Sequence, residues 1–180
     1  MLKKVKRALR KDWTPTSEQA GIGMMDSIWS IRLLYAVRMD WTPTPEQVEL
    51  GLTDGDEEYG RLFLPEIYVK RAWAKRGDFT PTREQISRGI SDKFWDIRIQ
   101  WAKRMDWTPD QDQAAMLLSD TNIQVVKAML NRCDWEMSNS LISAGLESTD
   151  RRVREAWMNK LRHIAEDELG DNSSTNAPTL

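Results

Sequence analysis

The sequence predicts an all-α protein, a right-handed α-solenoid of about five two-helix repeats of 28 residues each. A motif of the form Asp-aromatic-Thr-Pro recurs along the 180 residues, signals for the start of a helix follow most copies, and apolar residues four apart come next. Self-similarity with a period of about 20 to 50 residues is typical of stacked-repeat proteins.

The period is read from the first residue of each copy. These residues are Asp12, Asp40, Asp78, Asp106 and Asp134, so the spacings are 28, 38, 28 and 28 residues. The one longer interval indicates an insertion of ten residues in the second unit, near residues 55–64. The fifth copy, DWEMSNSLISAGLES, lacks the Thr-Pro, as expected of a terminal repeat.

The repeats set the expected domain boundaries. Residues 1–11 are expected to form an N-terminal capping helix that packs Val5 and Leu9, and residues 12–167 the repeat domain. Residues 168–180 are expected to form a disordered tail, because GDNSSTNAPTL contains few apolar residues.

The first helix of a unit is predicted from its N-terminal signals. Thr16, Thr44 and Thr82 are each followed three residues later by glutamine, which is the pattern of a capping box. Pro45 falls at the first helical position, where proline is favoured. A glycine near the end of this helix is expected to stop it in a left-handed conformation; the glycines concerned are Gly23, Gly51, Gly89 and Gly145.

The second helix is expected to begin around Asp26, Asp92 or Asp120, each a favourable N-cap residue. Its buried stripe is predicted from apolar pairs four residues apart, namely Ile31 and Tyr35, Val69 and Trp73, Ile97 and Trp101, Val125 and Met129, and Val153 and Trp157. The arginines at its end, where a cation suits the helix dipole, are Arg38, Arg76, Arg104 and Arg132.

The nine tryptophans fall into three groups by their position in the repeat. Those in the buried stripe are expected in the core, and they are Trp73, Trp101 and Trp157. Those of the motif are expected at the corner between units, together with Phe79, and they are Trp13, Trp41, Trp107 and Trp135. Trp29 and Trp95 recur only twice and are expected at the surface.

The second half of each unit resembles HEAT-type repeats and the short bacterial helical repeats related to them. In GISDKFWDIRIQWA, Asp92 is followed five and six residues later by Ile97 and Arg98. The same spacing relates Asp26 to Arg32. The resemblance covers about residues 12 to 162, and armadillo-like and leucine-rich-repeat-variant stacks remain alternative relatives.

The resemblance implies a hydrogen-bonded ladder between neighbouring repeats, with Asp26 and Arg32 in one unit and Asp92 and Arg98 in another. Lys70 and Val126 occupy the arginine position in two other units, where the pattern departs from the family. The resemblance further implies a bacterial or phage cytoplasm, and a single cysteine is also typical of a reducing compartment.

The residues offer little for catalysis, so we expect no enzyme, no cofactor and no metal. His163 is the only histidine, and Cys133 takes a repeat position filled by methionine in other units, which indicates an apolar role. The acidic cluster at Asp54 to Glu58 lacks the spacing of a calcium loop and is interpreted as a solvated loop. No apolar run approaches the roughly 20 residues of a membrane span.

Binding is the better functional class, because stacked helix pairs offer an extended concave surface. The favoured interpretation is a scaffold or adaptor for a protein partner that uses this surface and the insertion in the second unit. The insertion residues Tyr59, Leu62, Phe63 and Leu64 have no counterpart in the repeat. They are expected either to pack over the stack or to anchor the partner.

The alternative is a protein that binds the backbone of a nucleic acid through basic residues of the second helices: Arg71, Lys75, Lys103 and Arg104. Against it stands the composition, with 26 basic and 28 acidic residues and a net charge of −2. The identity of the partner and the oligomeric state stay open.

Overall fold

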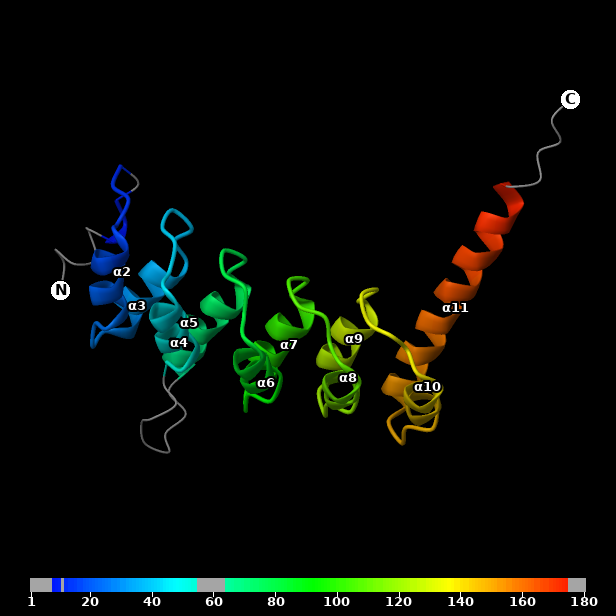
Figure 1. The fold of residues 1–180 in the computed structure, drawn as a ribbon. Helices are drawn as coiled ribbons and strands as arrows, with labels where there is room; N and C mark the ends of the chain where they lie inside the picture. Colours follow the sequence, from blue (N-terminus) through cyan, green and yellow to red (C-terminus); the bar gives the residue numbers. More distant parts are fainter. Residues whose placement is uncertain (1–7, 11, 55–63, 175–180) are drawn as a thin grey trace, which may run out of the picture. The chain divides into compact units, whose positions relative to one another are not determined.

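The computed structural model describes residues 8–10, 12–54 and 64–174, and side chains are described except at 64–66 and 168–174. Over this part the protein is all-α, with ten helices and no strand (Figure 1). In the same residues, no helix combines the length and the apolar character that a bilayer span requires. The predicted helical class is therefore confirmed.

The helices divide between two compact units. Unit 1, which ends at Trp107, contains α2 (Ser17–Met24), α3 (Trp29–Ala36), α4 (Pro45–Leu52), α5 (Leu64–Lys75), α6 (Arg83–Ile90) and α7 (Trp95–Lys103). Unit 2, which begins at Thr108, contains α8 (Gln111–Leu118), α9 (Ile123–Leu130), α10 (Asn139–Leu146) and α11 (Arg151–Ser174). Each even-numbered helix is the first of a pair, and each odd-numbered helix the second.

Within a unit, like helices pack against like. In unit 1 the second helices α3 and α7 both contact α5, and the first helices α2 and α6 both contact α4. In unit 2, α9 contacts α11. The two helices of each pair also contact each other, α8 with α9 and α10 with α11. The pairs therefore form two rows in unit 1, one of first helices and one of second helices.

The capping boxes predicted for the first helices are confirmed. The side chains of Thr16, Thr44 and Thr82 accept the N–H of the glutamine three residues later, and each glutamine accepts the N–H of its threonine in return. Asp110 makes the same box in front of α8. Pro45 lies at the first helical position.

The second helices begin two residues later than predicted. Their N-caps are Ile28, Phe94 and Asn122, not the aspartates before them. Each aspartate instead accepts the N–H of the residue two positions on, at 2.7–3.0 Å. This short-range bond is an Asx-turn, which turns the chain into the helix without occupying its cap.

The repeated glycines do not end the first helices. Gly51 and Gly89 lie inside α4 and α6, and a Cβ atom built on either would come 2.1–2.2 Å from the indole of Trp73 or Trp101. The prediction of a left-handed stop was wrong. Glycine is needed because the aromatic ring of the second helix packs directly on the backbone of the first.

One pair solves the same packing problem differently. In α8 the glycine position holds Leu117, and twelve residues later α9 carries Met129 where other pairs have tyrosine or tryptophan. Both side chains are fully buried. The larger side chain on the first helix is therefore matched by a narrower, non-aromatic side chain on the second, which keeps the core close-packed.

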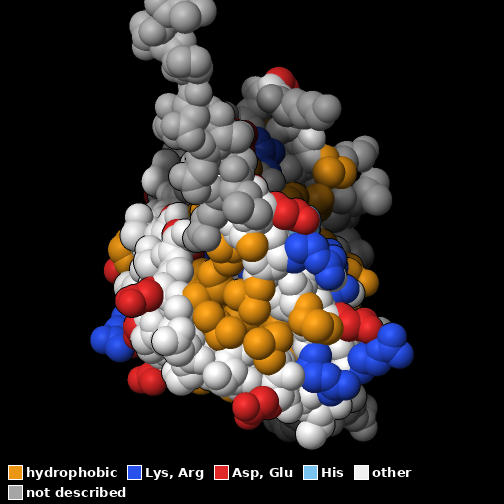
Figure 2. Space-filling model, turned by 90° about the vertical axis from the view of Figure 1, so that its right-hand side faces the viewer, with side chains coloured by type: hydrophobic (Ala, Val, Ile, Leu, Met, Phe, Trp, Pro, Cys, Tyr) orange, Lys and Arg blue, Asp and Glu red, His pale blue; other side chains and the backbone are white. Residues whose placement is uncertain are grey.

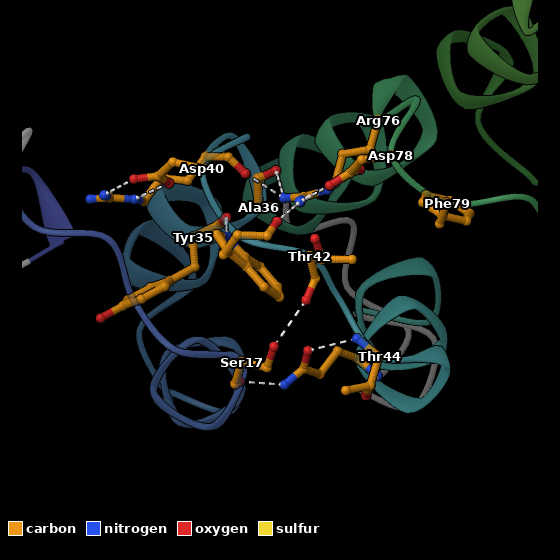
Figure 3. A network of polar contacts seen from close by, with 12 residues as sticks. Ser17, Tyr35, Ala36, Asp40, Thr42, Thr44, Arg76, Asp78 and Phe79 are labelled. Atoms are coloured by element: carbon orange, nitrogen blue, oxygen red, sulfur yellow. Dashed lines mark hydrogen bonds and ion pairs between the residues drawn. The ribbon is translucent and has the colours of Figure 1, made fainter.

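The corner between pairs is organised around a buried arginine. Arg76 donates from Nε to Asp78 at 2.9 Å, and Nη2 makes a second bond to the same carboxylate. Nη1 donates to the carbonyls of Ala36 (3.1 Å) and Arg38 (2.6 Å), and Nη2 also to that of Trp41 (3.1 Å) (Figure 3). All five N–H groups of the guanidinium are thus satisfied.

The same corner recurs in unit 1. Arg104 donates to the carbonyls of Ala74, Arg76 and Phe79, and Arg38 to those of Ala8, Arg10 and Trp13. Each arginine also pairs with the aspartate two residues later. The hydrogen bond from Arg38 lowers the pKa of Asp40, so this carboxylate stays ionised well below neutral pH.

Aromatic rings cover the guanidinium of Arg76. The Cζ atom of Arg76 lies 4.7 Å from the ring centroid of Trp41 and 4.9 Å from that of Trp73. The predicted core and corner positions are confirmed for six tryptophans, which are buried: Trp41, Trp73, Trp101, Trp107, Trp135 and Trp157. The corner arginines do more than complement a helix dipole, because within unit 1 Arg76 and Arg104 each join a helix pair to the one before it.

The chain ends differ from the predictions. Leu9 is exposed and Ala8 is buried in its place, while Val5 lies outside the described residues. Helix α11 continues to Ser174, so residues 168–174 are helical where a disordered tail was expected. Lys160 holds the arginine position in α11 and donates only to the carbonyl of Arg132, at 3.3 Å.

Replacing Gly89 with alanine is expected to lower the free energy of unfolding by roughly 1–3 kcal/mol. Alanine favours helix by up to about 1 kcal/mol, but its methyl group overpacks the core against Trp101. The midpoint of urea denaturation measures the change. Gly77→Ala is the control, because no atom lies within 4 Å of its added carbon.

The double variant Gly89→Leu, Trp101→Met transplants the arrangement of Leu117 and Met129. It is expected to unfold at a higher urea concentration than Gly89→Leu alone. An equal or lower midpoint would contradict the proposed size matching.

Arg76→Lys is expected to cost roughly 3 kcal/mol in unfolding free energy, because lysine has three donors for the five acceptors around the buried guanidinium. Arg10→Lys is the matched control. Arg10 pairs with Asp12 at the same spacing but in solvent, so no measurable change is expected. Equal losses in the two variants would show that the carbonyl contacts contribute little.

Candidate functional site

The insertion predicted as a protein-binding site lies largely outside the described residues. Tyr59, Leu62 and Phe63 belong to that segment, and Leu64 is described only as the first residue of α5. Their role as a partner anchor stays a prediction. The described residues of unit 1 offer a second surface, on the second helices that follow and precede the insertion.

The N-terminal ends of these helices are held by a ladder of charged side chains. Arg32 on α3 donates to the carboxylate of Asp54 at 2.6 and 2.9 Å, and to the backbone carbonyl of Asp26 at 2.8 Å. Arg98 on α7 makes the equivalent backbone bond to Asp92, at 2.7 Å. Asp26 and Asp92 thus serve the arginine of their own repeat through the main chain.

The carboxylate partner comes from the next repeat. Lys70 on α5 contacts the Asp92 carboxylate at 3.2 Å, and both side chains are buried. In this repeat lysine therefore takes the ladder position that arginine holds in the repeat before it. Asp54 is also buried, so the interpretation of the whole acidic cluster from Asp54 as a solvated loop was wrong for this residue.

Three large aromatic side chains are exposed beside this ladder. They are Trp29 on α3 (36% exposed), Tyr68 on α5 (50%) and Trp95 on α7 (48%). We call these three residues the aromatic face. The rings of Trp29 and Tyr68 are 6.3 Å apart at an interplanar angle of 30°. The exposure predicted for Trp29 and Trp95 is confirmed.

Tyr68 was missed in the sequence because its repeat position holds serine, aspartate, glutamine and arginine in the other units. Its neighbour Ile67 takes the position of Trp29 and Trp95 and is only half-buried. Three consecutive second helices therefore each present an aromatic residue near their N-terminal ends. Single exposed apolar residues are common, but a row across adjacent helices indicates a contact surface.

Basic residues lie on the same helices toward their C-terminal ends. Lys75 and Lys103 are exposed and line an open groove of about 420 Å³ at the ends of α5 and α7. Gln100 and Met105 also line it, and Met105 is exposed. The groove thus offers two ammonium groups and a thioether to a ligand.

Two of the four residues predicted to contact nucleic acid are engaged within the fold. Arg104 is buried, and its donors go to Asp106 and to three backbone carbonyls, so this prediction was wrong for Arg104. Arg71 is partly exposed and lies 3.9 Å from the carboxylate of Asp96. Lys75 and Lys103 remain as exposed cations of that set.

The described residues contain no candidate metal centre. Among them, no group of three or more histidine, cysteine, aspartate or glutamate side chains could hold a metal ion. Cys133 is exposed, as are Met39 and Met105 at the same repeat position, so the apolar packing role predicted for it was wrong. His163 is exposed beside Glu166, with 3.4 Å between Nδ1 and Oε2.

Comparisons of the chain with protein-family models, with curated proteins and with solved structures found no match.

Proposed function

We propose that the protein is a non-enzymatic scaffold or adaptor that binds a protein partner through the aromatic face of unit 1. The observation that carries the proposal is the exposure of Trp29, Tyr68 and Trp95 on three consecutive second helices. Six other tryptophans of the chain are buried by the repeat packing, so these rings are not needed to close it. Tryptophan and tyrosine are the residues most enriched at interaction hot spots.

The scaffold is proposed to be a right-handed α-solenoid of about five repeats. Support comes from geometry that recurs within unit 1, where Arg38, Arg76 and Arg104 repeat the same set of carbonyl contacts. Stacked helix pairs hold their surface side chains at regular intervals, which suits an extended partner.

The surroundings of the aromatic face indicate the chemistry of the partner. Lys75 and Lys103 continue the face along the same helices, and their charges are solvent-exposed. We therefore propose a partner segment that carries aromatic or aliphatic anchors followed by acidic residues. The insertion residues Tyr59, Leu62, Phe63 and Leu64 directly precede α5 in the chain and are proposed to add to this surface.

A second candidate function is binding to single-stranded nucleic acid. The same aromatic rings, with Lys75 and Lys103 nearby, are of the types that stack on bases and neutralise phosphates. Arg71 faces Asp96, however, and Arg76 and Arg104 are buried by the corners. Of the four basic residues predicted to contact a phosphate backbone, Lys75 and Lys103 are left, so the protein partner is favoured.

Peptides selected from a random displayed library are expected to combine aromatic or aliphatic anchors with acidic residues. Trp29→Ala and Trp95→Ala are each expected to weaken the selected peptide by at least about 30-fold, since a hot-spot truncation costs roughly 2 kcal/mol or more. Thermal unfolding of both variants should stay close to that of the wild type, because the rings are exposed.

Met116→Ala is the control, since Met116 is as exposed as Trp95 but lies on α8 in unit 2.

Binding of an oligothymidylate, measured by fluorescence anisotropy over a range of salt concentrations, tests the alternative of nucleic-acid binding. Affinity that falls steeply with salt and depends on Trp29 and Trp95 would favour nucleic acid over a protein partner.

A further inference from the structure

The end of unit 2 formed by α10 and α11 carries an apolar surface that the first pair of this unit does not leave open. Leu118 on α8 and Leu130 on α9 are 8% and 2% exposed. The residues 28 positions later, Leu146 on α10 and Met158 on α11, are 37% and 48% exposed. Figure 2 shows hydrophobic side chains gathered at this end, with acidic and basic side chains around them.

Helix α11 gives this surface a regular stripe. Met158, Leu161 and Ala165 are spaced three and four residues apart, and none of the three is buried. Spacing of this kind places side chains on one face of a helix and is the pattern by which two helices pack along a common seam. We call Leu146 together with Met158, Leu161 and Ala165 the terminal face.

The two halves of α11 carry opposite charges. Residues 151–162 contain five basic side chains and one acidic side chain, whereas residues 163–171 contain four acidic side chains and no lysine or arginine. Arg162 is exposed in the basic half, and Glu166 and Asp167 are exposed in the acidic half. Two such helices side by side attract each other only when they run in opposite directions.

Among the described elements of unit 2, the C-terminal half of α11 lies beyond the end of α10. Figure 1 shows α11 extending past α10, and the helix reaches Ser174. An isolated helical segment of about 12 residues is only marginally stable in water. A partner lying along the terminal face would cover the apolar stripe and support this segment at the same time.

We propose that the terminal face is the interface of a symmetric homodimer, in which α11 of a second copy packs antiparallel to α11 of the first. The occupant is a second copy because the charges of α11 are complementary to those of the same helix read in reverse. The two-fold axis passes near Leu161, midway along the stripe from Met158 to Ala165. An interface of this isologous kind closes on itself and stops at two chains.

The first test is the mass of the particle in solution, measured by sedimentation velocity at micromolar concentration. The wild type is expected at twice the 20.9 kDa of one chain. The double variant Leu146→Asp, Met158→Asp is expected to be monomeric, with a dissociation constant raised roughly 100-fold or more. Both side chains are exposed in one chain, so its circular-dichroism spectrum and melting temperature should be retained.

Met116→Asp is the matched control, because Met116 and Met158 are equally exposed at 48%. It is expected to remain dimeric. A monomeric wild type would overturn the proposal, as would a dimer that survives the double substitution. A series of larger species would also overturn it, since it would indicate that the terminal face binds a different surface of the next copy.

The second test is the direction of packing, measured by oxidation of single cysteines in a Cys133→Ser background. Arg162→Cys lies next to the proposed axis and is expected to form a disulfide between chains. Arg151→Cys is not, because antiparallel packing separates the two copies of this position by roughly 30 Å at 1.5 Å per residue. Disulfide formation at both positions would indicate parallel packing and overturn the antiparallel arrangement.

Discussion

The described corners of unit 1 depend on a guanidinium group that is removed from water and given five acceptors. Burial of an ion costs several kcal/mol unless it is paired and hydrogen-bonded, and Arg76 meets both conditions. Two acceptors are the oxygens of Asp78, in the same corner, and three are carbonyls of the preceding corner. The planar fork of arginine therefore joins two helix pairs at a defined distance and angle, which a flexible ammonium group does not do. The aromatic rings over Arg76 keep water from its faces.

The corners and the ladder act at opposite ends of the second helices. In unit 1 the corner arginine follows the C-terminal end of each second helix, and the ladder arginine lies within the N-terminal half, as with Arg32, the fourth residue of α3. A helix fixed at both ends has little freedom to rotate about its axis. Its remaining surface positions are consequently not needed to hold the helix in place. Trp29, Tyr68 and Trp95 occupy such exposed positions.

The helical class, the period and the starts of the first helices were predictable because they depend on local patterns. Thr44, Pro45 and Gln47 determine a helix start within four residues. The roles of Gly89 and Arg104 were not predictable, because each is set by a partner that is distant in sequence. The sequence pattern indicated a helix terminator at Gly89 and a surface cation at Arg104. The structure shows instead that the indole of Trp101 packs on Gly89 and that Arg104 donates to main-chain carbonyls. Of the candidate surface, Trp29 and Trp95 could be recognised by their irregular recurrence, but Tyr68 occurs once and left no signal.

The corner arginine contacts main-chain carbonyls of its neighbour, and this has a consequence for how such a chain changes over time. A carbonyl is present whatever the side chain, so Phe79 serves Arg104 as well as Trp41 serves Arg76. Some side-chain couplings, such as Gly89 with Trp101, lie inside one helix pair, whereas the ion pairs of the ladder join neighbouring repeats. A substitution at a position coupled only within its own pair, such as Gly89, therefore requires no change in the neighbouring pairs. Duplication or loss of a whole pair would leave these main-chain contacts of the corner intact, so the corner itself places no limit on the number of pairs.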